Sequence, residues 1–423
     1  MPLRSHNKTS VVPDSEKRDT NRRWTILALL FSITVINFID RQTVSVLAPL
    51  IKIAFHLSNE AYGRIVAAFQ FGMMSGELPM GLVMDRWGCR IGMCVAVFWW
   101  SLCTGSQAFT RSGLQLALSR FGMGSTECGN YSGGVKAVTE SLPRQHRTLA
   151  IGIFNSGSVI GAVVAPPLIV YLEERYGFRI AFFVPAVLGI LWTIVWWFTY
   201  PRHRRFKVTN LENPVEPLKS LLQESSAWAI MVCRGLIGPV IQFYWYWLPS
   251  YLYSARHMSM IQIGELSWIP FFLGSVGGVS GGWAAGWLMR KGWSTPGMRK
   301  ITMYAGSGLC FASAAVPWLV SPYCALLVIS IAIFGHNFLS ANMYGAITDL
   351  YHGSAVGRAT GLSGVAGGLS GLIFPLLTGY LVDQGSYRSV FLIASLLPLL
   401  GTVALFLIGR KYKSMSLYHH VSA

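Results

Sequence analysis

The sequence is a succession of long apolar stretches separated by short polar ones. A helix needs about 20 apolar residues to cross the hydrocarbon core of a bilayer. The stretches are too long and continuous for the alternating strands of about ten residues that form membrane barrels. We therefore predict an all-α membrane protein with twelve transmembrane helices, near residues 24–50, 62–84, 91–110, 114–139, 147–172, 179–200, 227–253, 264–289, 300–319, 322–350, 357–382 and 387–409.

The longest polar interruption divides these spans into two sets of six. The pattern predicts an N-terminal tail (1–23), a first six-helix half (24–200), a linker (201–226), a second six-helix half (227–410) and a C-terminal tail (411–423). The first 23 residues contain no apolar core, so we expect no cleaved signal peptide, and we expect the first span to act as the insertion signal.

The two halves also resemble each other in sequence. At a fixed offset of 209 residues, Pro166 matches Pro375 and Glu174 matches Asp383. Such repeats are typical of transporters whose substrate site lies at the repeat interface near the middle of the membrane. The halves are therefore expected to be pseudo-symmetric.

Composition and charge agree with this topology. Charged residues make up 12% of the chain, against about 25% in soluble domains. Of the 34 Lys and Arg, 23 lie in the tails, the linker and the loops on the same side, and seven lie in the opposite loops. By the positive-inside rule, we expect both termini to be cytoplasmic in a protein of the cell inner (plasma) membrane. The net charge of +17 then needs no nucleic-acid partner.

No pattern indicates an enzyme, a cofactor or a metal. The seven cysteines lack metal-site spacing, and the chain has no histidine cluster, phosphate-binding loop or nucleophile–base pair.

Ionisable residues inside the predicted spans are the strongest candidates for function, because a charge at mid-membrane costs at least about 2.5–3.5 kcal/mol. The first span carries Asn37, Asp40 and Arg41, and the fourth carries Arg120 and Glu127 on one helical face. Two arginines facing a cavity suit a carboxylate, and a carboxylate in the same dry cavity suits proton loading and release. The alternative is that Asp40–Arg41 or Arg120–Glu127 are structural ion pairs.

Neutral polar groups and aromatic rings mark the second half. Amides beside aromatic rings suit a polyhydroxylated solute, although aromatic residues in spans also pack or lie at the membrane interface. The candidates for solute contacts are Gln242, Tyr246, Ser340, Asn342 and, in the first half, Asn155. The second span adds Gln70 and Glu77.

The loop after the second span carries a recognisable motif, built from Gly81, Asp85, Arg86, Gly88 and Arg90. It resembles the G-x-x-x-D-R-x-G-x-R loop of the major facilitator superfamily. We expect this loop to latch the cytoplasmic side of one half and to release as the halves rock.

Within that superfamily, the chain resembles the anion:cation symporter family and, most of all, its hexuronate transporters. The resemblance rests on residues 37–42, 120–138, 243–249 and 340–342. It implies proton-coupled uptake of a sugar acid such as galacturonate or glucuronate by alternating access. Arg41 and Arg120 would hold the carboxylate, and Asp40 and Glu127 would take part in proton coupling.

The chain departs from the family where Gly238 replaces a common aspartate and Gln242 replaces an aromatic residue. The identity of the sugar acid therefore stays open, and an aldonate, an aldarate or an aromatic carboxylate is an alternative substrate. A drug–proton antiporter fits the cavity arginines less well. A sensor with a transporter fold would need a signalling domain, which nothing in the sequence resembles. We expect a monomer.

Overall fold

The computed structural model describes residues 14–201, 218–351, 354–385 and 387–409, and it contains no strand within these ranges. The first half consists of α1 (Asp14–Val46), α2 (Ala48–Ala54), α3 (Asn59–Gln107), α4 (Gly113–Glu127), α5 (Gly129–Ser141), α6 (Arg144–Tyr176) and α7 (Ile180–Thr199). The second half consists of α8 (Leu218–Gln223), α9 (Ser225–Ser254), α10 (Met260–Leu266), α11 (Trp268–Arg290), α12 (Thr295–Phe311), the 3₁₀ helix η1 (Ala312–Trp318), α13 (Pro322–Leu350), α14 (Ser354–Asp383) and α15 (Tyr387–Ile408).

The predicted all-helical fold is confirmed, with local differences. The second and third spans form the single element α3, which turns at Gly88. The fourth span is interrupted at Cys128 and the eighth at Ser267. When α3 is divided at Gly88 and the interrupted spans are joined, the described chain contains twelve long helical segments. Taken singly, eight of its helices are long and apolar enough to cross a membrane.

The ends of the predicted segments shift where local chemistry requires it. Helix α1 ends at Val46, and Pro49 lies in the first turn of α2, where the missing N–H of proline is tolerated. Helix α1 begins at Asp14, inside the predicted tail. Residues 1–13 and 411–423 of the predicted tails, residue 410 of the predicted second half and 202–217 of the predicted linker lie outside the described residues.

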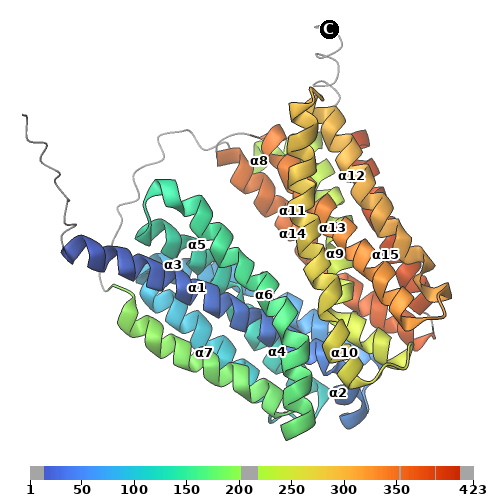
Figure 1. Cartoon of the computed structure of the whole chain (residues 1–423), viewed down its shortest axis with the longest axis horizontal. Helices are drawn as coiled ribbons and strands as arrows, with labels where there is room; N and C mark the ends of the chain where they lie inside the picture. Colours follow the sequence, from blue (N-terminus) through green and yellow to red (C-terminus); the bar gives the residue numbers. More distant parts are fainter. Residues whose placement is uncertain (1–13, 202–217, 352–353, 386, 410–423) are drawn as a thin grey trace, which may run out of the picture.

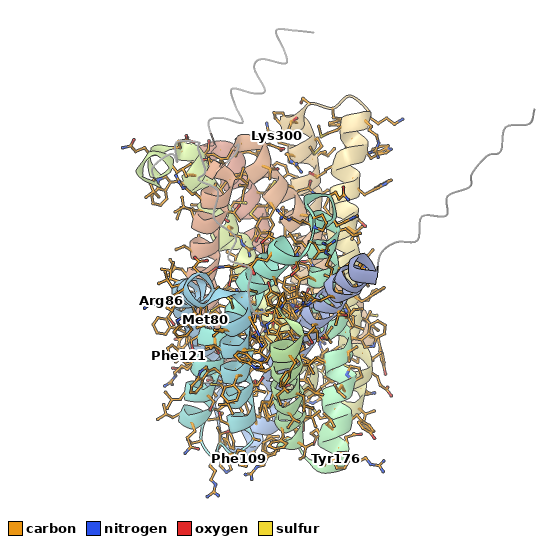
Figure 2. The ribbon with its side chains drawn as sticks, turned by 90° about the vertical axis from the view of Figure 1, so that its left-hand side faces the viewer. Met80, Arg86, Phe109, Phe121, Tyr176 and Lys300 are labelled. Atoms are coloured by element: carbon orange, nitrogen blue, oxygen red, sulfur yellow. The ribbon has the colours of Figure 1, made fainter. Side chains whose placement is uncertain are left out.

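The two halves lie side by side in Figure 1: α1 and α3–α7 occupy the left and centre, α9–α15 lie on the right, and α2 lies at the lower right below α10. Their ribbons converge where α2 and α10 lie and diverge toward α8. We call these the closed end and the linker end. Figure 2 places Lys300 at the linker end and Phe109 and Tyr176 at the opposite end.

At the closed end, glycines let α3 and α14 touch backbone to backbone. A side chain at Gly63 would put its Cβ 2.5 Å from the carbonyl oxygen of Pro375, and one at Gly379 would put it 2.6 Å from that of Asn59. The Tyr62 hydroxyl donates to the Tyr246 carbonyl at 2.8 Å, which joins α3 to α9. These contacts hold the two halves together at this end.

Toward the linker end, the face of α14 that carries Gly379 no longer contacts the first half. A Cβ at Gly368 would lie 3.1 Å from Met74 of the first half, whereas a Cβ at Gly364, Gly361 or Gly357 would meet nothing within 4 Å. The apolar core divides in the same way. One cluster runs through both halves, and a second, which includes Ile230, belongs to the second half alone. The structure is therefore open at the linker end.

A carboxylate from one half caps a helix of the other half at the closed end. Asp383, the last residue of α14, accepts hydrogen bonds from the backbone N–H groups of Asn59 (2.9 Å) and Glu60 (2.7 Å) at the start of α3. A negative charge is favourable at a helix N-terminus. Lys52 donates to the Asn59 side chain at 2.8 Å, and burial lowers the pKa of Lys52 to about 8. This inter-half cap holds the closed end shut.

We expect Asp383→Asn to loosen the closed end, because the amide loses the charge that faces the α3 N-terminus. Loss of a charge at a helix N-terminus costs about 0.3–1 kcal/mol, or up to roughly a fivefold change in population. Spin labels are placed at Phe109 and Val320, which are exposed at this end of the first and second half. Pulsed electron paramagnetic resonance then measures the distribution of distances between the two labels. Longer distances should become more populated.

The matched control is Glu174→Gln. Glu174 stands at the repeat-related position near the end of α6, where its exposed carboxylate makes no hydrogen bond to the described residues. The neighbouring helix α10 is capped instead by its own Ser259–Gln262 capping box. Unchanged distances in Asp383→Asn, or equal changes in both variants, would show that the cap does not hold the halves together.

Candidate functional site

A buried ion pair joins α1 to α4. Both helices belong to the first half, and the pair lies where this half faces the second. Both Nε and Nη2 of Arg41 donate to Glu127 Oε1, at 2.9 and 2.5 Å. The Glu127 side chain is fully buried, whereas 17% of the Arg41 side chain is exposed. Charge-assisted hydrogen bonds of this kind are roughly twice as strong as neutral ones. Of the two partners, Arg41 is the one that water or a solute can reach.

Two further ionisable groups beside this pair, Arg120 and Asp40, form no ion pair within 4 Å among the described residues. Arg120 is completely buried, and its nearest acceptors are Met123 Sδ at 3.4 Å and the Arg41 carbonyl at 3.5 Å. Both carboxyl oxygens of Asp40 are buried without a hydrogen-bond partner among the described residues. The structure thus pairs Arg41 with Glu127 across two helices, and it forms neither Asp40–Arg41 nor Arg120–Glu127.

Phe69 of α3 lies beneath both arginines, a feature that the sequence analysis missed. Its ring centroid is 4.3 Å from Arg120 Cζ and 5.4 Å from Arg41 Cζ. Phe38 is 5.1 Å from Arg41 Cζ. Aromatic faces attract guanidinium groups, more strongly when the pair is desolvated. In the sequence, the only signal for this contact was the position of Phe69 directly before Gln70, on a span that also carries Glu77.

The second half meets this charged centre through α9. Gln70 of α3 donates to Gln242 Oε1 of α9 at 2.5 Å, so one amide from each half closes the site. Tyr246, one turn further on, is buried with its ring 6.4 Å from Phe69. A small cavity beside Arg41 is lined by Phe38, Gln42, Trp245 and Tyr246. Charged groups from the first half and neutral groups from the second therefore face each other.

The remaining predicted contact residues are placed differently. Asn37 is buried near this centre along α1, with an Nδ2 that finds no acceptor in the described chain. Asn155 is exposed on α6. Ser340 on α13 has a buried hydroxyl without a partner among the residues described. Asn342 is fully engaged within the second half: its amide group bonds Arg299, Gly281 and Phe338.

The motif loop is held within the first half. Lys136 of α5 donates to Asp85 Oδ1 and to the Met84 carbonyl, both at 2.7 Å. Arg90 donates to the Trp197 carbonyl of α7, and its Cζ lies 4.2 Å from the Trp197 ring centroid. The loop therefore ties α3 to α5 and α7 at the linker end, without an ion pair to the second half among the described residues.

The flanking motif residues have simpler environments. Arg86 is exposed. A Cβ at Gly81 or Gly88 would meet nothing within 4 Å. Gly88, however, has φ 79° and ψ 167°, a backbone conformation that is essentially restricted to glycine. This residue makes the turn between the two spans of α3.

Two helical halves that close on each other at one end, open at the other and bury charged groups between them define a multi-pass membrane transporter, not an enzyme. The chain belongs to the Major Facilitator Superfamily, whose family model matches residues 30–338 and 324–417. The expected superfamily and fold are thus confirmed.

Relatives of known name are similar over nearly the whole chain. The hexuronate transporter of Escherichia coli K12 is 26% identical, over 90% of this chain and 93% of its own length. A probable L-galactonate transporter of the same strain is 29% identical, over 92% and 89%. A probable galactarate/D-glucarate transporter of Bacillus subtilis is 28% identical, over 90% of each chain.

The fold also matches a solved structure. A bacterial homologue of the human lysosomal transporter Spinster, in its inward-facing and unoccupied conformation, superposes with a TM-score of 0.78 at 18% identity. The match covers 93% of this chain and 98% of that one. It supports the fold and the arrangement of the two halves.

We expect Gly88→Ala to destabilise the protein, because an L-residue at this φ and ψ costs about 1–3 kcal/mol. The midpoint of thermal unfolding in detergent should fall by several degrees. Gly81→Ala is the control: Gly81 is helical with open space at its Cβ, so alanine should be neutral or slightly stabilising. Equal midpoints for the two variants would show that the turn does not require a glycine.

Proposed function

We propose that this protein is a proton-coupled secondary transporter that imports a sugar acid, a hexuronate such as galacturonate or glucuronate, by alternating access. The observation that carries the proposal is the buried Arg41–Glu127 ion pair beside Arg120 and Asp40, neither of which forms a close ion pair with a described residue. Two cations and two carboxylates between the halves suit an anionic solute and a proton. The names of the relatives support the substrate class.

The ion pair suggests how proton and anion are coupled. While Glu127 is ionised, it occupies two donor groups of Arg41. Protonation of Glu127 removes the charge that holds Arg41, which then binds the carboxylate of the solute. When the solute leaves, Glu127 releases its proton to water and pairs with Arg41 again. The structure, open at the linker end with the pair formed, corresponds in this scheme to the state after release.

The rest of the site suits the neutral part of a sugar acid. The amides of Gln70 and Gln242 come from opposite halves and offer donors and acceptors to hydroxyl groups. Tyr246 and Phe69 provide ring faces for the C–H side of the sugar. A solute that replaces the Gln70–Gln242 hydrogen bond contacts both halves, which links its binding to their movement.

The distribution of lysine and arginine orients this scheme. The linker end carries the positive excess, so we propose that both termini and the linker face the cytoplasm and that the structure is inward-facing in the inner membrane. The proposed carrier acts as a monomer, since one chain contributes every residue of the site.

Uptake of labelled galacturonate into proteoliposomes, with and without an inward proton gradient, tests the proposal. The gradient should drive accumulation in the wild type. Glu127→Gln should lose accumulation at least tenfold and keep exchange of labelled for unlabelled solute, because the amide cannot release a proton. Glu77→Gln, which neutralises an exposed carboxylate on α3, is the control and should behave as the wild type.

Each alternative gives a different result. A wild type that ignores galacturonate would contradict the substrate class. Uptake that is indifferent to the proton gradient would contradict the coupling. Loss of accumulation in Glu77→Gln but not in Glu127→Gln would move the proton site to α3.

A further inference from the structure

Arg234, on α9 two turns before Gln242, is a partly buried cation for which the proposed mechanism gives no role. Its Cζ lies 5.5 Å from the ring centroid of Tyr344 on α13, and its Nε is buried without an acceptor among the described residues. No carboxylate of the described chain lies within ion-pair distance of it. Because an unpaired arginine at membrane depth is costly, such residues usually mark a path or a site for an anion.

The surroundings of Arg234 leave space for a ligand group. Gly238, one turn along α9, would place a Cβ 3.9 Å from Arg234 Nη1 and 3.7 Å from the hydroxyl of Ser370. On α14, Gly367 lies against the arginine side chain, and Gly364 faces open space. The guanidinium is therefore flanked by glycines rather than by side chains that would fill the position of a bound anion.

Polar groups on α13 complete the environment. Ser340 is one turn from Tyr344 on the same helical face, and its buried hydroxyl has no partner within the described residues. The Tyr344 ring thus contacts the guanidinium, and the Ser340 hydroxyl lies one turn away from Tyr344 on the same helix. Their donors match a carboxylate, which accepts hydrogen bonds through both oxygens.

The position of this group relative to the Arg41 site decides what kind of anion it takes. Arg234 and Gln242 are eight residues apart on one helix, which corresponds to a rise of about 12 Å. Gln242 bonds Gln70, the residue that follows Phe69 under Arg41 and Arg120. This separation, less the reach of an arginine side chain, suits a six-carbon chain with an acidic group at each end.

We propose that Arg234, Ser340 and Tyr344 form a second anion subsite, which binds the distal carboxylate of a six-carbon sugar diacid. The inference rests on the proposed function, because the first carboxylate is taken to bind Arg41. A diacid pairs Arg234 with an opposite charge. A sugar acid with one carboxylate leaves Arg234 unpaired, so the subsite favours diacids.

The sharpest test places a competing carboxylate beside Arg234. Because a Cβ at position 238 makes only ordinary van der Waals contacts, Gly238→Asp fits and puts an acidic group one turn from the guanidinium. Gly238→Asn is the size-matched neutral control. Equilibrium binding of galactarate and galacturonate to the purified protein is measured for the wild type, both variants and Arg234→Gln.

Gly238→Asp and Arg234→Gln should weaken galactarate binding at least tenfold and change galacturonate binding less than twofold. Gly238→Asn should bind both as the wild type does. Equal losses for the two ligands in Gly238→Asp, or full galactarate affinity in Arg234→Gln, would overturn the second subsite.

The wild type separates this inference from the proposal on which it rests. Binding of galacturonate without binding of galactarate would overturn the second subsite and leave the proposed function in place. Binding of neither ligand would overturn the proposed function and the subsite with it.

Discussion

The structure depends on the cost of placing charge between helices in a membrane. Arg41 and Glu127 offset that cost for each other through two hydrogen bonds to one carboxylate oxygen. Arg120 and Asp40, directly beside them, form no close ion pair with any of the residues described. Removing one partner of a buried pair leaves an uncompensated charge and costs about 3–5 kcal/mol. Binding of a ligand or a proton that changes the charge of this centre therefore supplies enough free energy to change which groups form ion pairs.

The fold converts that local change into a change of access. At the closed end, Gly63 and Gly379 allow backbone contact between α3 and α14, and Asp383 caps α3 from the opposite half. At the linker end, the glycines that continue the same face of α14 meet nothing. The charged centre and the Gln70–Gln242 contact lie between these two regions. In the proposed mechanism, a solute bound there touches both halves at the level about which they rock.

The sequence was sufficient for the architecture because membrane insertion imposes strong rules. Span length, the lysine and arginine bias and the 209-residue repeat each follow from the bilayer or from internal duplication. The breaks at Cys128 and Ser267 each had a local signal that went unused: Gly129 follows the first, and at the second Pro270 lacks the N–H that would bond to the Leu266 carbonyl.

The candidate site was predictable in composition but not in pairing. Helical periodicity places Arg120 and Glu127 on one face, which suggested a pair within α4, whereas the rotation of α1 against α4 brings Arg41 to Glu127 instead. Phe69 and Arg234 acquire their importance from neighbours on other helices, which one sequence does not reveal. Conversely, Asn342 was predicted to contact the solute, but in the fold its side chain accepts a hydrogen bond from Arg299.

The central claim is that a proton on Glu127 and a carboxylate on Arg41 bind together. The most direct measurement is the number of protons taken up when galacturonate is added to the purified protein in weakly buffered solution, near neutral pH. The account predicts net uptake of about one proton per bound solute in the wild type and none in Glu127→Gln. Binding of galacturonate without any proton uptake in the wild type would contradict it.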